Sequence, residues 1–218
     1  MKTATYHDAL TIFHNTVESE LRVSKTLNAG LLKMADQAII DHYSAEISNA
    51  THSGQRVWLT SDLHFGHYNI IKYSGRPFFD LREMTEAHLS LLSKVPDNEW
   101  LVLVGDMALS GDYQAGVETI RKIPGRKLLV AGNHDLRKDG FCALAKEPDL
   151  FEAVVPFLYW SQLNSLVIVT HYPVAMPFGS KQMVLNYHGH LHQKTLDATE
   201  QVKYVNVGWD VHYGLLCI

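Results

Sequence analysis

Cysteine is nearly absent from this 218-residue chain, and the two that occur, Cys142 and Cys217, show neither metal-binding nor redox-motif spacing. Two such thiols suit a reducing compartment, although a single disulfide between them remains open. Long apolar runs are absent too: none approaches the length of a membrane span, and the first residues lack the apolar stretch of a signal peptide. We therefore expect a cytoplasmic protein with no membrane partner.

An excess of positive charge is also lacking, since the net charge is -4 at pH 7. Bulk nucleic-acid binding requires a basic face, so we expect none. A single nucleotide is still allowed as a ligand, because bound metal ions can supply positive charge locally. The 46% apolar and 19% charged composition permits a full core, and the length suits one domain with an appendage.

Five short apolar runs each end at residues that can bind a metal, and such runs are typical of buried strands. The run from Val57 leads to Asp62 and His64, the run from Leu101 to Asp106, and the run from Leu128 to Asn133. The run from Leu166 leads to His171, and the run from Met183 leads to His190 and His192. Ligands of open α/β proteins gather at the carboxyl ends of strands. One such residue alone usually belongs to a turn, but five endings of this kind predict a shared metal site.

The types of ligand limit which metals could bind and which reaction they could support. Carboxylate, imidazole and amide groups together suit Mn, Fe or Zn better than a soft metal or calcium. Seven ligands are too many for one tetrahedral zinc, but they suffice for two ions bridged by one carboxylate. Two-metal sites hydrolyse phosphate esters with a metal-bridging hydroxide as nucleophile. A covalent route is not indicated, because the chain has no Gly-x-Ser-x-Gly elbow and no nucleophilic cysteine motif.

Residues 1–54 form a separate helical segment ahead of the first strand. Apolar residues from Leu10 to Ile47 recur at helical spacings, and the segment has no proline. We expect two helices that break near Asn28 and Gly30, or one long helix buried against a partner chain. The apolar stripe could pack on the chain's own catalytic domain or form a homo-oligomer. Because the metal-binding residues all lie downstream, we expect the segment to supply no ligand.

Residues 55–218 alternate strands with helical stretches. The apolar spacing predicts helices over Leu81 to Val95 and Val117 to Ile123. The β-rich segments from Phe151 to Trp160 and from Val202 to Val207 have no intervening helix, which suggests antiparallel or mixed pairing. The pattern predicts a layered α/β fold with more than one sheet.

The same metal-binding blocks resemble, in order, the signature of the calcineurin-like metallophosphoesterases. The blocks are Asp62-x-His64, Gly105-Asp106, Gly132-Asn133-His134-Asp135, His171 and Gly189-His190-x-His192, with Asn206-Val207-Gly208 similar to the family's closing strand. The stretch from Asp62 to Ile70 also looks like a small bacterial and phage branch of predicted phosphoesterases. The resemblance implies a two-sheet β-sandwich flanked by helices, preceded here by the N-terminal helical extension.

The resemblance also implies roles for individual residues. Asp62, His64 and His192 would hold one divalent ion, Asn133, His171 and His190 the other, and Asp106 would bridge them. His134 would act as general acid on the leaving oxygen, and Asp135 would orient it. Manganese is our first choice of metal, with iron, nickel, zinc and magnesium as alternatives.

Three further residues are candidates for contact with the substrate. His67 either lines the pocket or merely starts the next helix, and Arg76 and Arg137 are the local candidates for a phosphate clamp. The alternative for either arginine is a solvated loop residue, an interpretation that we favour slightly for Arg137.

The sequence thus predicts a binuclear phosphohydrolase, a phosphodiesterase or nucleotidase that acts on a small phosphorylated substrate such as a nucleotide. One alternative is a protein Ser/Thr phosphatase. Against it, that group carries Glu after the Asn-His pair and Asp-Arg-Gly after the bridging Asp, whereas here Asp135 and Met107-Ala108-Leu109 occur. The other alternative is a non-catalytic interaction module that works through the N-terminal helices, but such proteins have a broken site, and this chain retains every ligand.

Overall fold

Two β-sheets, packed face to face, form the centre of the computed structural model, which describes residues 4–20, 22–107 and 113–218. One sheet has five strands in the order β4-β3-β2-β1-β9, and the other has four in the order β5-β6-β7-β8. The strands are β1 (Val57–Thr60), β2 (Trp100–Leu103), β3 (Arg126–Val130), β4 (Ala153–Val155), β5 (Phe157–Gln162), β6 (Ser165–Thr170), β7 (Val184–His188), β8 (Val202–Asn206) and β9 (Leu216–Cys217). The predicted α/β sandwich is confirmed.

Strand direction brings the metal-binding residues to one side of the sandwich. Strands β1 to β4 are parallel, as are β6, β7 and β8, while β5 and β9 run antiparallel to their neighbours. The second sheet therefore has the mixed pairing that its sequence suggested. Because parallel strands share one carboxyl edge, the loops after β1, β2, β3, β6 and β7 can meet there.

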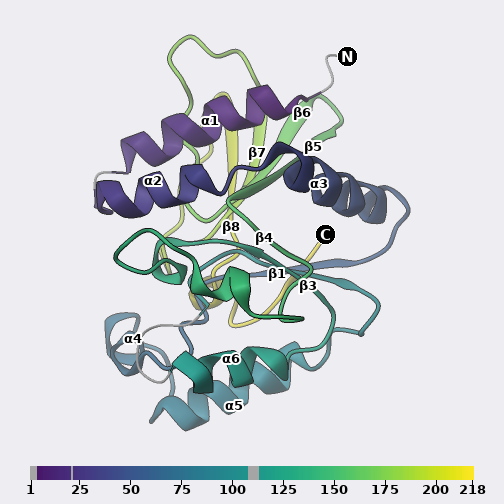
Figure 1. Cartoon of the computed structure of the whole chain (residues 1–218). Helices are drawn as coiled ribbons and strands as arrows, with labels where there is room; N and C mark the ends of the chain where they lie inside the picture. The colour runs from purple at the N-terminus through teal and green to yellow at the C-terminus, as the bar shows by residue number, and fades with distance from the viewer. Residues whose placement is uncertain (1–3, 21, 108–112) are drawn as a thin grey trace.

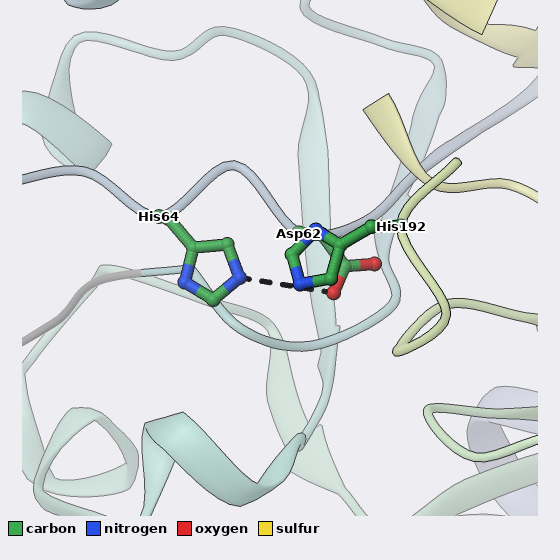
Figure 2. A group of neighbouring side chains, drawn as sticks. All are labelled: Asp62, His64 and His192. Atoms are coloured by element: carbon green, nitrogen blue, oxygen red, sulfur yellow. Dashed lines mark ion pairs between the residues drawn. The ribbon is translucent and has the colours of Figure 1, made fainter. Parts of the chain in front are cut away.

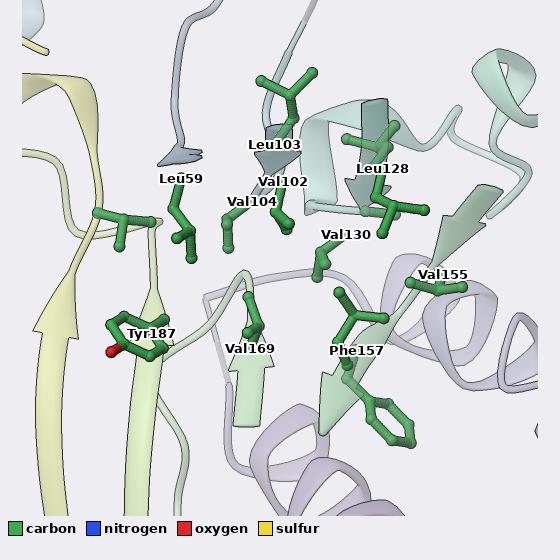
Figure 3. Packing of buried hydrophobic residues seen from close by; sticks show 14 of the residues in the cluster. Leu59, Val102, Leu103, Val104, Leu128, Val130, Val155, Phe157, Val169 and Tyr187 are labelled. Atoms are coloured by element: carbon green, nitrogen blue, oxygen red, sulfur yellow. The ribbon is translucent and has the colours of Figure 1, made fainter. Parts of the chain in front are cut away.

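The core between the sheets is made of branched aliphatic side chains. Leu59, Val102 and Val130 from the first sheet face Val169 and Tyr187 from the second (Figure 3). All five are buried, with Tyr187 the most exposed at 9%. Strands buried on both faces are continuously apolar, which explains why β2 and β6 show no alternation of polar residues.

Short helices cover the outer face of the first sheet. They are α5 (Leu81–Leu92) and α6 (Tyr113–Arg121), which lie below that sheet in Figure 1, and α4 (Tyr68–Tyr73) lies beside them. The remaining helical turns are η1 (Asn133–Asp135), η2 (Ala143–Lys146) and α7 (Trp209–His212). No helix within the described ranges is both long and apolar enough to cross a membrane.

The described residues of the N-terminal extension form three helices, and the expected break near Asn28 and Gly30 was wrong. The helices are α1 (Tyr6–Ser19), α2 (Lys25–Lys33) and α3 (Gln37–His52). New helices begin where a side chain can cap them: Ser24 accepts from the Leu27 amide, and Asp36 accepts from the amides of Ala38 and Ile39. Gly30 instead lies inside α2, where a Cβ atom would collide with the Gly140 carbonyl oxygen.

The extension packs on the outer face of the second sheet, where α1 and α3 lie against the strands and α2 packs on α1 and η1 (Figure 1). The Phe13 ring lies 4.9 Å from the Phe157 ring of β5. Polar contacts add to this packing, because the Tyr159 amide donates to Ser44 Oγ at 3.0 Å and Asn15 donates to the Ala175 carbonyl at 2.7 Å. The apolar stripe is covered within the chain, which removes the argument for an oligomer through these helices.

Candidate metal centre

Most of the predicted ligands occupy an unusual backbone conformation. Positive φ angles occur at Asp62 (60°), His64 (54°), Asp106 (56°), His190 (68°) and His192 (52°). A residue with a Cβ atom in such a sparsely populated region costs about 1–3 kcal/mol, and strain of this kind clusters at functional sites. The strand ends are therefore shaped to aim side chains at a common point, at the expense of local stability.

The first group of ligands consists of Asp62, His64 and His192. One potential ligand atom from each lies within 4.8 Å of the others. Figure 2 shows the three side chains together, with His64 Nε2 3.8 Å from Asp62 Oδ1. The rings of His64 and His192 are stacked, with centroids 5.2 Å apart.

The second group consists of Asp106, His171 and His190, again with ligand atoms within 4.8 Å of one another. His171 is oriented by its Nδ1, which lies 2.9 Å from the Val104 carbonyl, so that Nε2 approaches Asp106 Oδ2 at 3.3 Å. The same Asp106 oxygen is 3.8 Å from His64 Nε2. Asp106 thus lies between the two groups.

His64 Nε2 and the side-chain oxygen Oδ1 of Asn133 are buried ligand atoms with no hydrogen-bond partner among the described residues. His171 Nε2 is buried as well and lies 3.3 Å from Asp106 Oδ2. A buried polar atom without a hydrogen bond is costly. An imidazole nitrogen and an amide oxygen without partners, beside two buried carboxylates, fit a divalent cation that accepts both nitrogen and oxygen ligands. The residues present therefore suit the metal ions that the sequence predicted.

The pKa values at the site follow from burial and crowding. Burial raises the pKa of Asp62, although the neighbouring His171 opposes the change. For Asp106, burial acts in the same direction, but the imidazoles of His171 and His64 outweigh it and lower the pKa. Burial lowers the pKa of His190 to about 3, and the charge on His171 contributes. Asp106 is thus ionised and His190 neutral, the forms that bind metal. At His171 burial lowers the pKa, but the Asp106 carboxylate outweighs it and raises the pKa to about 10, so an ion would have to displace the proton of this ligand.

Glycines make room for the ligands at two loops. A Cβ atom at Gly105, whose φ is +86°, would collide with His171 Nδ1. A Cβ atom at Gly189 would collide with Ser61 and would lie 2.6 Å from Asp62 Oδ2. The glycines of the Gly-Asp and Gly-His motifs are therefore required by close approach of the backbone to the ligands.

His134 lies exposed beside this centre. Its backbone N–H donates to Asp106 Oδ1 at 2.9 Å, and its ring lies 5.5 Å from the His64 ring. The side chain is therefore held next to the ligands while remaining accessible.

Asp135 does not orient the His134 ring as predicted. Its Oδ2 accepts from the backbone amides of Asp106 and Gly132, both at 2.8 Å, and its Oδ1 accepts from Met107 at 2.9 Å. These bonds join the loop after β3 to the loop after β2, so Asp135 positions Asp106 instead. Burial and the adjacent Asp106 charge raise the pKa of Asp135 to about 7.

The prediction that Arg76 forms a phosphate clamp was wrong, because its side chain is buried and bound to protein groups. Its Nε lies 2.7 Å from Asp210 Oδ1, and its Nη2 lies 3.0 Å from Asp210 Oδ2. The guanidinium also donates to the carbonyls of Asp62 and Leu63. Arg76 thus supports the loop after β1 from beneath, where a substrate cannot reach it.

The other two substrate candidates lie differently. His67 is half-buried at the residue before α4, with its ring 5.8 Å from the His64 ring, so it both borders the site and precedes a helix. Arg137 is exposed on a turn, where its guanidinium lies 3.8 Å from Asp139. Its position matches the solvated-loop alternative.

Two functional residues were missed at the sequence level. Asp210 accepts from His192 Nδ1 at 2.7 Å, and Asn206 donates to the His192 carbonyl at 2.9 Å. Asn206 belongs to the closing Asn206-Val207-Gly208 motif, and Asp210 follows it by two residues. The motif at the end of β8 could therefore have pointed to both residues. Of the run Met107 to Ser110, which separates this chain from Ser/Thr phosphatases, residues 108–110 lie outside the described residues.

Comparison with known proteins identifies this arrangement. The family model of the calcineurin-like phosphoesterases matches residues 55–215. The chain belongs to this family. It is therefore a metal-dependent phosphoesterase, and the calcineurin-like domain begins where the N-terminal extension ends.

Relatives of this calcineurin-like phosphoesterase come from phages and an archaeon. The chain is 24% identical over 188 residues to the Gene 66 protein of Mycobacterium phage D29, a match covering 73% of this chain and 90% of the phage protein. It is 34% identical over 85 residues to an uncharacterized protein of Methanocaldococcus jannaschii, covering 38% of this chain and 48% of that protein. The chain thus matches about half the length of the archaeal protein.

A solved structure shows the same fold. The crystal structure of a protein of unknown function from Aquifex aeolicus is similar with a TM-score of 0.56 at 22% identity, covering 74% of this chain and 95% of that one. At this level of identity the similarity supports the fold alone.

Proposed function

We propose that this protein is a binuclear phosphodiesterase or nucleotidase that acts on a small phosphorylated substrate. The observation that carries the proposal is the meeting of two three-residue ligand groups at Asp106, with His134 exposed beside them. Asp62, His64 and His192 would hold one ion, and Asn133, His171 and His190 the other. Two divalent ions bound there would supply an activated water and neutralise phosphoryl oxygens.

The protein's own groups complete the reaction. Asp106 would supply negative charge to both ions, and Asp135 keeps Asp106 in place through three backbone amides. The exposed His134 imidazole donates a proton to the departing oxygen of the ester, which removes the cost of expelling an alkoxide. His67 borders the same face and contributes to the pocket wall.

Two observations favour a small substrate, one against a phosphoprotein and the other against a long nucleic acid. The residue after the Asn-His pair is Asp135, whose carboxylate is fully engaged with the backbone amides around Asp106. The net charge of -4 also argues against long nucleic acids, whereas a nucleotide monomer can be held by metal-phosphate contacts. A purely non-catalytic module is disfavoured because every expected ligand position carries a residue that can bind a metal.

The first test concerns metal content. The two ligand groups predict about two divalent ions per chain, held as in two-metal hydrolases. Full-length protein is loaded with Mn²⁺, dialysed, and measured by elemental analysis. Saturation at one ion per chain in an active enzyme would contradict the binuclear arrangement.

The second test concerns the reaction. Mn²⁺-loaded protein is expected to hydrolyse bis(p-nitrophenyl) phosphate and cyclic or short nucleotides faster than it hydrolyses phosphoserine peptides, with chelator-treated protein as the control. The measurement is kcat/KM across the series. A higher value for phosphopeptides would favour the Ser/Thr phosphatase alternative, and metal-independent activity or none would exclude the proposal.

A further inference from the structure

Each of the two histidines in the Gly189-to-His192 loop has a carboxylate next to one of its ring nitrogens. On one side, His192 Nδ1 lies 2.7 Å from Asp210 Oδ2, which leaves Nε2 to face the first ligand group. Arg76 holds Asp210 with two nitrogen-oxygen contacts of 2.7 and 3.0 Å. An arginine, a carboxylate and a ligand histidine thus form a chain that ends at the first metal site.

On the other side, a carboxylate of the N-terminal extension approaches His190. The Glu20 Oε2 atom lies 3.6 Å from His190 Nε2, and the two side chains are only 12% and 13% exposed. Arg22 holds Glu20 with Nε-Oε1 and Nη2-Oε2 contacts of 3.0 Å each. As around His192, an arginine holds a carboxylate and the carboxylate approaches a histidine. Glu20, however, lies outside the part of the chain that matches the phosphoesterase family.

The end of α1 is fixed at this place by several contacts. Asn28 of α2 donates to the carbonyls of Val17 at 2.9 Å and of Glu20 at 3.2 Å, which ties α2 to the last turn of α1. The close approach of Gly30 and Gly140 seats α2 on the turn that follows the Asn133-to-Asp135 loop. The carboxylate therefore reaches His190 from a packed helix end.

Glu20 is not placed as a ligand itself. Among the described residues, the second group with ligand atoms within 4.8 Å of one another contains Asp106, His171 and His190, and Glu20 is outside it. A carboxylate at the Nε2 side of an imidazole favours the tautomer with its proton on Nε2 and frees Nδ1 for an ion.

We propose that Glu20, held by Arg22, is a positioning residue for His190 and thereby sets the affinity of the second metal site. The inference rests on the proposed binuclear function and agrees with the expectation that the extension supplies no ligand, because Glu20 acts through His190. It gives the N-terminal extension a defined role, because α1 delivers from outside the family domain the kind of carboxylate that Asp210 supplies from within it.

The test is a titration of Mn²⁺ into full-length, chelator-treated protein, with both dissociation constants measured by calorimetry. Glu20→Gln keeps the size of the side chain but removes its charge, and the affinity of the second ion is expected to fall about 10–100-fold, the usual effect of losing such an outer carboxylate. The first ion and the thermal midpoint of the chelator-treated protein should not change. Glu18→Gln is the matched control, because Glu18 lies on the same helix with 66% of its side chain exposed.

Three results would overturn the inference. Unchanged affinity for the second ion, equal weakening of both ions, or a lowered thermal midpoint before metal is added would each show that Glu20 does not act through His190. The readout is independent of turnover. A protein that binds two ions and responds to Glu20→Gln, yet hydrolyses no phosphate ester, would refute the proposed function and leave this inference standing.

Discussion

Replacing Asp106 with asparagine is expected to remove most of the bound metal and nearly all hydrolysis. The carboxylate lies between the two ligand groups, with one oxygen 3.3 Å from His171 Nε2 and 3.8 Å from His64 Nε2. The asparagine amide has a single oxygen and no negative charge, so it would attract two divalent cations much more weakly than the carboxylate. The loss of affinity should therefore exceed the ~10–100-fold effect that is typical of residues one shell further out.

The measurement is elemental analysis of dialysed Asp106→Asn protein together with kcat. Folding should be retained, because the amide oxygen can still accept the His134 backbone N–H that Asp106 Oδ1 accepts at 2.9 Å. Asp197→Asn makes the same change of charge in an exposed loop and should leave both values as they are. Full metal content in the Asp106 variant would show that the carboxylate does not join the two sites.

Replacing His134 with alanine is expected to separate catalysis from metal binding. Alanine keeps the backbone N–H that Asp106 accepts, so the metal content should stay near normal. The proton donor is lost, and turnover of substrates with alkoxide leaving groups should fall ~10²–10⁴-fold, the usual contribution of a positioned general acid. Nitrophenyl esters should lose less, because nitrophenolate leaves without a proton.

Kinetics over a series of leaving groups, with metal analysis alongside, tests this expectation. His52→Ala is a suitable control, since His52 is exposed at the end of α3 and its hydrogen bonds among the described residues go to Ser48, one turn away. An equal loss for every leaving group would point to electrostatic stabilisation by His134 instead of proton transfer. A loss of metal would give the residue a structural role.

The metal-binding set is the part of this protein that its sequence determined most fully. Each ligand follows a short apolar run, and that pattern is local: a buried strand needs four or so branched residues, and its carboxyl end is where a turn begins. Parallel pairing of such strands brings their ends together without further information. The sequence alone therefore assigns Asp62, Asp106 and His171 to one centre.

The supporting residues were decided by tertiary packing. Arg76 and Asp210 are 134 positions apart, and nothing in the local sequence of either shows that the arginine is buried under the β1 loop instead of facing substrate. Asp135 likewise bonds to the loop after β2, which is adjacent only because β2 and β3 pair.

The N-terminal extension shows the same division. Its helical periodicity predicted helices, while the capping residues Ser24 and Asp36 decided that there are three. The periodicity could not say which surface the apolar stripe would cover, since any apolar face can satisfy it. Only the packing of α1 and α3 on β5 places Glu20 beside His190, because hydrophobic burial has no direction whereas a carboxylate-imidazole contact requires a particular one.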